Sequence, residues 1–390
     1  PTAEVVTREI KMQKYDTKGV LVWEVGADRA EGELSPDGDY TKVEGVTVIV
    51  HDDGKPAFII DADRGEVSKS TGKLDLRGNV TAKSADDSTS LSCDRITYSV
   101  GDETLRATGN VTGESNGMSI GPAKQIDAKF RNVTKNMNAS AATALVLTSL
   151  IAQGPGITYK DNAGNMSISG VDKFSMKPDA SGTIYSFSGS GSPFIAKWHK
   201  QGIEVTARTV AGSFAVVQRG TSKSWELRSG KFTGNITATM DGERGNMKMS
   251  GLSVFNMELT EAKRWKFTGT GSPITVNLPD SGVVINGNTF EGYASGATAK
   301  PEWETAILTG GVKAVITQKD SDSGETYTVT ATCPRVEINR ANHFVRLSGG
   351  ARAEGNHPAM GPGGATITSP VVILKFDELM KKVVEVELER

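Results

Sequence analysis

One stretch of the sequence is copied along the chain, and this repetition limits the folds that are open to it. Residues 62–81 read ADRGEVSKSTGKLDLRGNVT, and residues 93–112 read CDRITYSVGDETLRATGNVT. The two copies align without a gap at an offset of 31 residues, so that Asp63-Arg64 falls on Asp94-Arg95. A period of this length indicates a repeat architecture, in which successive units stack on one another.

Shorter copies extend the pattern in both directions. Upstream, Ala27-Asp28-Arg29 begins a third copy, and downstream Cys333-Pro334-Arg335 matches the second copy at an offset of 240. In the second half, the segment at 164–176, GNMSISGVDKFSM, returns at 245–257 as GNMKMSGLSVFNM. We therefore expect a first β-roll module at residues 1–135 and further β-roll repeats at residues 136–390, stacked continuously on the first.

Within each copy, the spacing of apolar residues is that of β-strands. Phe58, Ile60 and Ala62 alternate with mostly polar residues, which places the apolar side chains on one face of a strand. A turn follows each Asp-Arg pair, and the next strand closes on Gly-Asn, where the glycine predicts a bulge or corner at which the sheet bends. Because adjacent strand residues point to opposite faces, we expect the Asp-Arg pairs to find ion-pair partners on neighbouring strands.

Residues 139–152 are the one place where a short helix competes with a strand. Their leucines and alanines fit either a short helix or a buried strand, and Gly154-Pro155-Gly156 ends the segment. The rest of the chain, with its 44 glycines and many Thr, Ser and Val residues, favours short strands and tight turns. We therefore predict an all-β fold with one short helix at most, near 139–152, and a closing strand or frayed tail at 383–390.

The composition excludes several classes of protein. A formal net charge of −2 offers no basic field for nucleic acid, and no apolar run is long enough to span a bilayer. Cys93 and Cys333 occupy equivalent repeat positions, many layers apart in a stacked array, which favours buried thiols over a disulfide. Because the chain opens on Pro1, we expect a processed or trimmed product that has lost a signal peptide or an N-terminal inner-membrane anchor.

None of the motifs of catalysis or metal binding is complete. Residues 117–121 match the GxSxG pattern of a nucleophile elbow, but strands surround Ser119 where that elbow requires a strand-turn-helix. Residues 320–324 resemble the start of a calcium loop, yet the glycine comes one place early and Ala331 stands where such a loop ends on glutamate. The four histidines are scattered, and we expect them at exposed loop or strand positions. We predict that the protein is not an enzyme and uses no metal or cofactor.

The order of these motifs resembles one known family, the periplasmic bridge proteins of lipopolysaccharide export with their LptC-like and OstA-like (LptA) β-jellyrolls. Trp23-Glu24 before the first Asp-Arg pair resembles the opening of the LptC-like proteins, and Asp53-Gly54-Lys55-Pro56 continues it. Gly78-Asn79-Val80 extends the likeness into the OstA-like repeat. The resemblance covers residues 20–115, with a further match at 331–350.

The resemblance implies both a fold and a function. The implied fold is an elongated β-jellyroll, a V-shaped roll of two facing antiparallel sheets whose apolar interior is open along one side. The implied function is that of a lipid-binding carrier in the periplasm, which relays lipopolysaccharide or a related glycolipid from the inner to the outer membrane along an apolar groove. The implied partners are the glycolipid, an inner-membrane transporter, and other export-bridge proteins that dock on the end strands by β-augmentation.

The groove candidates are the apolar positions in register along the strands. In the first copies these are Phe58, Ile60, Leu74, Leu76, Leu91, Ile96, Tyr98 and Leu105. Their later equivalents are Phe187, Phe232, Ile236, Phe267, Leu308 and Leu347. Plain core packing explains each of these residues equally well.

Two other classes of protein remain as alternatives. The first is a structural or surface protein, a β-solenoid stalk or adhesin with a filled interior. The second is an enzyme acting on a polysaccharide, which would need a carboxylate pair that is evident at none of the motifs. The width of the interior distinguishes the first alternative from a carrier, because a solenoid packs its core shut whereas a carrier keeps an apolar trough.

Overall fold

A computed structural model gives the structure of the protein. It describes residues 4–16, 18–33, 40–52, 54–68, 70–99, 101–115, 117–137, 140–161, 166–199, 202–219, 222–242, 245–295, 303–319, 324–360, 364–378, 380 and 382–389.

The described part of the chain is built of β-strands, which confirms the predicted all-β fold. Its 21 strands belong to one antiparallel sheet, and its helical residues are those of two short 3₁₀ helices, η1 (Pro279–Ser281) and η2 (Pro358–Met360). The first nine strands are β1 (Glu4–Tyr15), β2 (Leu21–Glu33), β3 (Tyr40–Asp52), β4 (Lys55–Ser68), β5 (Lys73–Ser84), β6 (Thr89–Ser99), β7 (Thr104–Ser115), β8 (Met118–Met137) and β9 (Ser140–Asp161). The others are β10 (Met166–Pro178), β11 (Ile184–Trp198), β12 (Ile203–Arg219), β13 (Ser222–Gly242), β14 (Gly245–Leu259), β15 (Trp265–Leu278), β16 (Val283–Ala294), β17 (Trp303–Lys319), β18 (Thr326–Asn339), β19 (Phe344–Gly355), β20 (Ala365–Phe376) and β21 (Val383–Glu389).

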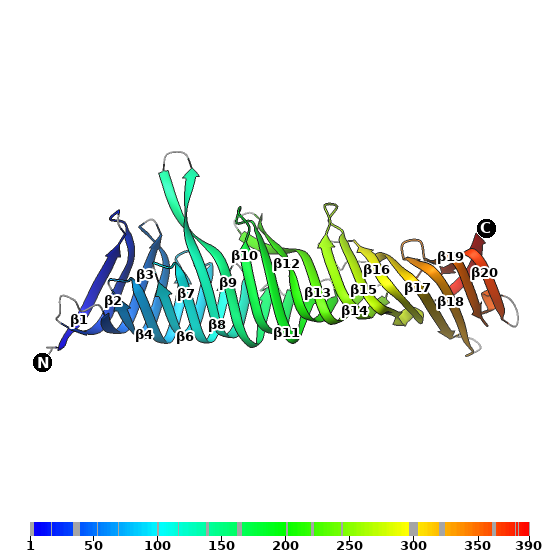
Figure 1. The fold of residues 1–390 in the computed structure, drawn as a ribbon, viewed down its shortest axis with the longest axis horizontal. Helices are drawn as coiled ribbons and strands as arrows, with labels where there is room; N and C mark the ends of the chain where they lie inside the picture. The colour runs from blue at the N-terminus through cyan, green and yellow to red at the C-terminus, as the bar shows by residue number, and fades with distance from the viewer. Residues whose placement is uncertain are drawn as a thin grey trace. The chain divides into compact units, whose positions relative to one another are not determined.

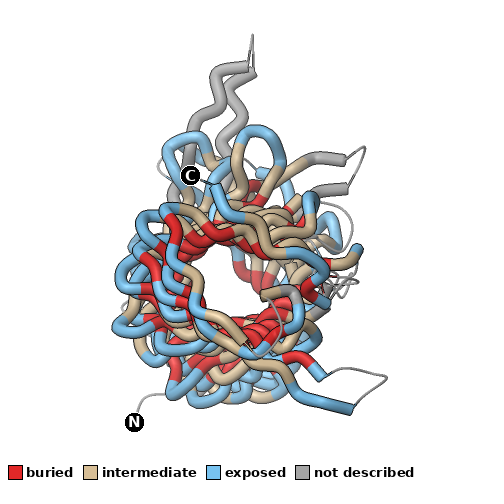
Figure 2. Tube along the Cα trace, turned by 90° about the vertical axis from the view of Figure 1, so that its right-hand side faces the viewer, coloured by how far each residue is buried: buried red, intermediate tan, exposed pale blue. Residues whose placement is uncertain are grey.

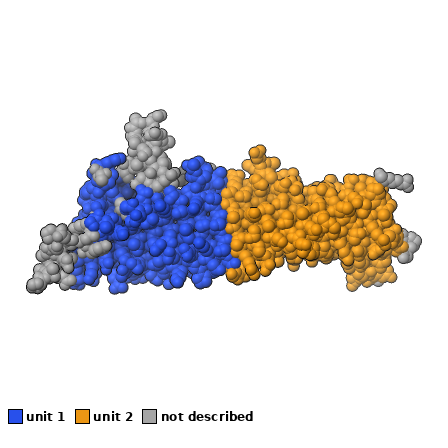
Figure 3. All heavy atoms as spheres, viewed as in Figure 1, with its two compact units in different colours: residues 1–164, 168–191, 214–226 blue, residues 165–167, 192–213, 227–390 orange. Residues whose placement is uncertain are grey.

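The strands follow one another through the sheet in chain order (Figure 1). Each strand from β1 to β8 pairs antiparallel with the next, as does each strand from β13 to β20, and β9 also pairs with β10. The chain forms two compact units (Figure 3). Unit 1 comprises residues 1–164, 168–191 and 214–226, and unit 2 comprises residues 165–167, 192–213 and 227–390.

The strands bend where the sequence repeats Gly-Asn. Gly78 and Asn79 both have positive φ angles, 79° and 44°, and the register between β4 and β5 shifts at this point. Gly109 and Asn110 repeat the arrangement with φ angles of 80° and 48°. Left-handed backbone is open to glycine and tolerated by asparagine, so this residue pair supplies a bulge that turns the strand. The corner predicted from the sequence is therefore confirmed.

The Asp-Arg pair lies opposite this corner, and both of its members face outward. Asp63 and Arg64 are exposed while the residues on either side are buried, so the alternation along β4 breaks here. The expectation that the pair points to opposite faces is thus wrong, because β4 bends opposite the bulge of β5 and both residues face outward at this corner. Asp63 accepts a hydrogen bond of 2.9 Å from Asn79 Nδ2, and its carboxylate covers Gly78. One local contact therefore explains why Asp, Gly and Asn recur together.

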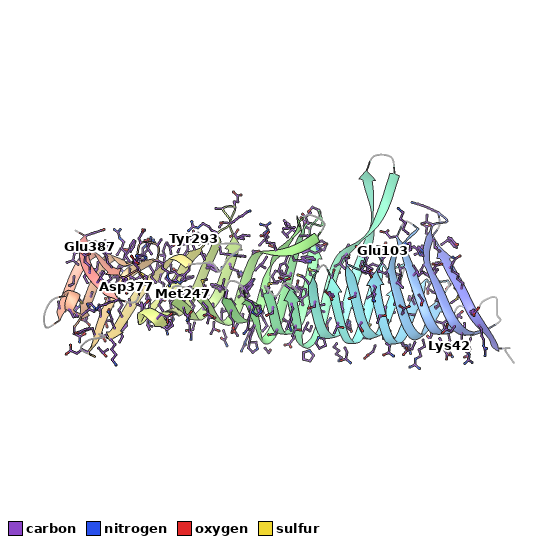
Figure 4. The ribbon with its side chains drawn as sticks, turned by 180° about the vertical axis from the view of Figure 1, so that it is seen from behind. Lys42, Glu103, Met247, Tyr293, Asp377 and Glu387 are labelled. Atoms are coloured by element: carbon purple, nitrogen blue, oxygen red, sulfur yellow. The ribbon has the colours of Figure 1, made fainter. Side chains whose placement is uncertain are left out.

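Two arginines of the Asp-Arg pairs, Arg95 and Arg29, form ion pairs with carboxylates of neighbouring strands, as predicted. Arg95 of β6 lies 2.5 Å from Asp75 of β5, and Arg77 approaches the same carboxylate at 2.7 Å. Partial burial raises the pKa of Asp75, but hydrogen bonds from Arg95 and Arg77 outweigh it and leave the pKa below its ordinary value. Arg29 of β2 similarly lies 3.7 Å from Glu44 of β3. Figure 4 shows many side chains that extend outward from the ribbon.

The helix considered near 139–152 does not form. Residues 140–152 belong to β9, which pairs with β8 along its whole length. The pairing gives alternate residues of the segment backbone hydrogen-bond partners on β8, and Thr148 Oγ1 adds a hydrogen bond of 2.9 Å to the Lys129 carbonyl. β-branched residues such as Thr148 and Ile151 also favour extended backbone.

The core lies on the inner face of the sheet, where Figure 2 shows the buried residues. In unit 1, Trp23 and Val48 are fully buried, and in unit 2, Ile274 and Val336 are. Cys93 and Cys333 are both free and buried, and each thiol donates a hydrogen bond to a backbone carbonyl two residues further on. Residues 383–389 form the predicted closing strand, β21, which pairs with β20.

Candidate functional site: an apolar cavity in unit 1

Unit 1 contains a cavity of ≈ 380 Å³ between two walls of its sheet. Its lining runs from Val50 on β3 to Trp225 on β13, and it is composed mainly of aliphatic and aromatic side chains. Several of these, including Phe58, Leu91 and Leu105, are only half-buried. The cavity is therefore not sealed from solvent, and its volume is in the range of ligand pockets, about 300–1,000 Å³.

Strand register places the lining in two rows. Tyr98, Leu105 and Ala128 are partners across β6, β7 and β8. Leu91, Gly113 and Ile120 are partners across the same three strands on the other side of the bulges. Because the bulges bend each strand between its two rows, the rows belong to facing walls. The repeat thus builds the cavity by carrying an apolar position on each side of every corner.

Five of the residues predicted to line a groove are found in the lining of this cavity: Phe58, Ile60, Leu91, Tyr98 and Leu105. Three others in the same copies, Leu74, Leu76 and Ile96, have no exposed surface and pack in the core beside it. Leu74 is the cross-strand partner of Tyr98, so position along the strand does not by itself decide which residue lines the cavity.

The later candidates are all buried. Phe187 of unit 1 is 6% exposed and lies in an aromatic cluster next to the cavity. In unit 2 the remaining candidates are at most 2% exposed: Phe232, Ile236, Phe267, Leu308 and Leu347. Phe232 and Phe267 both pack against Phe255, with ring centroids 6.1 and 6.0 Å apart. A groove role for these residues stays a prediction.

The cavity offers almost no charge to a ligand. Among its lining residues Glu114 alone is charged, and it lies exposed at the rim. Burial, with a smaller effect of Glu103, raises the pKa of the Tyr98 phenol to about 12, so that it stays neutral. Tyr159 donates a hydrogen bond of 2.7 Å to Met118 Sδ. Such a surface suits an uncharged, apolar group.

The two incomplete motifs of the sequence, the GxSxG pattern and the calcium-loop candidate, can now be compared with the structure. Ser119 of the GxSxG pattern lies within β8 and lines the cavity, with no helix following it. The calcium-loop candidate at 320–323 lies outside the described residues. In the described part of the chain, no group of three or more His, Cys, Asp or Glu side chains could hold a metal ion.

One histidine contradicts the expectation of exposed positions. His357 is 6% exposed, and its Nε2 lies 3.2 Å from Gln318 Oε1. The same oxygen accepts a hydrogen bond of 3.1 Å from the backbone N–H of Val383, and the ring meets Tyr327 edge-on. Burial first, and the charge of Lys382 second, lower the pKa of His357. Its burial follows from this polar cluster, which joins three distant segments of unit 2.

Sequence reasoning missed the part of the cavity that lies beyond the repeat copies. Phe130, Leu147 and Leu150 come from the β8–β9 hairpin, and Phe174 and Trp225 come from β10 and β13. Phe174 and its equivalent Phe255 occupy corresponding positions of the larger repeat, which is a usable signal of an inward aromatic position. Trp225 carries no such signal.

Together, the rolled repeat sheet and its uncharged cavity define a class, the β-jellyroll proteins with an apolar interior. Residues 2–124 match the family model described as "Lipopolysaccharide-assembly, LptC-related", and this match identifies that segment as LptC-like. It confirms the resemblance seen in residues 20–115 and implies that the protein takes part in lipopolysaccharide transport. No curated protein matches the chain. In the part of the chain that the structure describes, no helix is long and apolar enough to cross a membrane.

Proposed function

We propose that unit 1 holds acyl chains of lipopolysaccharide, or of a related glycolipid, in its cavity while the protein relays the lipid across the periplasm. The observation that carries this proposal is the apolar cavity of ≈ 380 Å³ in the unit that contains the LptC-like segment. Each methylene that enters it is stabilised by about 0.8 kcal/mol. A chain of ordinary length thus gains several kcal/mol without any specific polar contact.

The half-buried lining suits a ligand that must leave again. Leu105 and Leu91 on facing walls remain partly exposed, so an acyl chain can enter sideways while its sugar head group stays in water. Glu114 is the one charged residue of the lining, and the other polar groups there are a few hydroxyls, phenols and the Trp225 indole, so the lining is mainly apolar. The affinity therefore depends on the apolar area that is buried and not on one fixed orientation of the ligand, as a relay requires.

The end strands would connect the protein to its neighbours in a bridge. β21 pairs with β20 along one edge, and β1 pairs with β2 along one edge. On β21, Val384 and Leu388 are 56% and 52% exposed, which is unusual for large apolar residues on this surface. A strand added there would gain backbone hydrogen bonds and cover both side chains. We propose other export-bridge proteins and an inner-membrane transporter as the partners.

Photocrosslinking in the native host tests the carrier role. A benzophenone amino acid would replace Leu91 or Leu105 in the lining, and Lys83 as the matched control on the outer face of the adjacent β5. We expect glycolipid adducts at the two lining positions and none at Lys83. Folded protein that captures lipid at no lining position would refute the carrier role and favour a stalk with a structural function.

A further inference from the structure

The cavity ends on an aromatic wall that lies outside the LptC-like segment. Tyr159, Phe174, Tyr185 and Trp225 line the cavity at its β9–β13 end, whereas the family match stops at residue 124. The rings are in contact with one another. Tyr159 and Phe174 stack with centroids 5.9 Å apart, and Tyr185 meets Trp225 edge-on at 4.7 Å.

A second layer of rings supports this wall from behind. Phe187 and Phe214 stack at 4.4 Å and are 6% and 1% exposed. Phe187 also stacks on Phe174 at 6.3 Å, and Phe214 meets Trp225 edge-on at 6.4 Å. Tyr159 also stacks on Phe214, at 6.4 Å, so three rings of the first layer are held by one in the second, and Tyr185 is held by Trp225.

The other end of the cavity is different in kind. There the lining residues are Val50, Ile60 and Ala82, with Phe58 half-buried among them. Aliphatic side chains on single strands can change rotamer to admit a methylene, whereas a ring locked between two others cannot move alone. An apolar chain that grows toward β13 therefore meets a fixed surface.

We propose that these six residues, the aromatic wall, set the longest acyl chain that unit 1 accepts. The proposal rests on the proposed function, because it presupposes that the cavity holds acyl chains. Affinity should rise about fourfold with each added methylene, which is ~0.8 kcal/mol, until the chain reaches the wall. Beyond that length the added carbons stay in water and the affinity levels off.

The test is a binding series with saturated fatty acids of stepwise increasing length, kept below their critical micelle concentrations and measured by competition against a fluorescent acyl probe. We expect a break in the plot of log Kd against length for the wild-type protein. Phe174→Ala should move the break to longer chains. Phe255→Ala removes another buried ring, from the stack in unit 2, and should leave the break where it was. Phe174→Leu, a milder truncation, serves as the second variant if Phe174→Ala does not fold.

Three outcomes are distinguishable. A break that moves in the Phe174 variants alone supports the proposal. A wild-type break that stays at the same length in folded Phe174 variants overturns the aromatic wall while leaving the carrier role intact. Wild-type protein that binds no fatty acid at any length overturns both.

Trp225 provides an independent readout of the same idea, because it is itself part of the wall. Fatty acids brominated near the methyl end should quench its fluorescence more than those brominated near the carboxyl group. The quenching should disappear in Trp225→Phe, which identifies the responding tryptophan. Equal quenching by both brominated series would contradict an end wall that the chain approaches tip first.

Discussion

Replacing Gly78 by alanine tests the corner on which the roll depends. Gly78 has a φ of 79°, and a Cβ at this position would lie 2.5 Å from Asp63 Oδ2 and 3.0 Å from Asp63 Cβ. Two separate costs are therefore expected. One is left-handed backbone in a residue with a side chain, and the other is displacement of the aspartate that caps the bulge.

Two other glycines of unit 1 separate these costs. Gly117 has nearly the same φ, 77°, but a Cβ there would meet nothing within 4 Å. Gly101 has neither a positive φ nor a neighbour within 4 Å. Gly101→Ala should thus stabilise the fold by about 0.4–1 kcal/mol through the unfolded chain, and Gly117→Ala should destabilise it by about 1–2 kcal/mol. Gly78→Ala adds an overpacking cost of about 1–3 kcal/mol to the same strain.

Urea denaturation, followed by far-UV circular dichroism, measures the three variants in the same unit. The free energy of unfolding should fall in the order Gly101→Ala, Gly117→Ala, Gly78→Ala. The double variant Asp63→Ala/Gly78→Ala should be destabilised by less than the sum of the two single changes, because the clash with the carboxylate is removed and only the close approach to the Cβ at position 63 remains. If Gly78→Ala is no worse than Gly117→Ala, or if the double variant shows no coupling, the aspartate does not shape the corner and the reasoning fails.

Three further predictions concern the cavity and two titrating groups. Leu105→Gln should weaken fatty-acid binding about tenfold, because an amide facing the chain loses its hydrogen bonds to water; isothermal titration calorimetry checks this, and an unchanged Kd would place the ligand elsewhere. Hydrogen bonds from Ser84, Ser88 and a backbone N–H hold the pKa of Asp86 at about 2, so carboxyl NMR should show a midpoint near that value, and Ser88→Ala should raise it. Burial lowers the folded-state pKa of His357 below its ordinary 6.5. Its neutral form therefore contributes stability that is present above pH 6.5 and lost as the pH falls through the folded-state value. The free energy of unfolding of His357→Gln should depend less on pH in that window, and an unaltered dependence would contradict the assignment.

Much of the fold could be predicted because the same sequence pattern, with the same backbone geometry, recurs in several copies. Gly78-Asn79 and Gly109-Asn110 both need left-handed backbone. A local requirement that recurs in several copies predicts the corner without knowledge of tertiary contacts. The segment at 139–152 had no copy to compare with, and its leucines fit two periods. Pairing with β8 decided between them, which is a tertiary effect that local spacing does not contain.

The cavity could be predicted only in part. Alternation identifies the inward face of a strand but not the distance to the facing wall, so Leu76 and Leu105 look alike in the sequence although one is fully buried and the other lines a space. The aromatic wall depends on which strands end beside one another in unit 1. Trp225 is 100 residues or more from most of the lining residues in the sequence, and no periodicity predicts that it lies beside them.

The chain-order pairing of the strands has a consequence for how such a protein comes into being. When each strand hydrogen-bonds to the one before it, a growing chain needs no distant segment to begin ordering. Each pairing then costs only the entropy of closing a short loop, because most backbone hydrogen bonds between strands join neighbours in the chain. A polypeptide that emerges N-terminus first could form its sheet strand by strand, because each new strand pairs with the free edge of the strand before it.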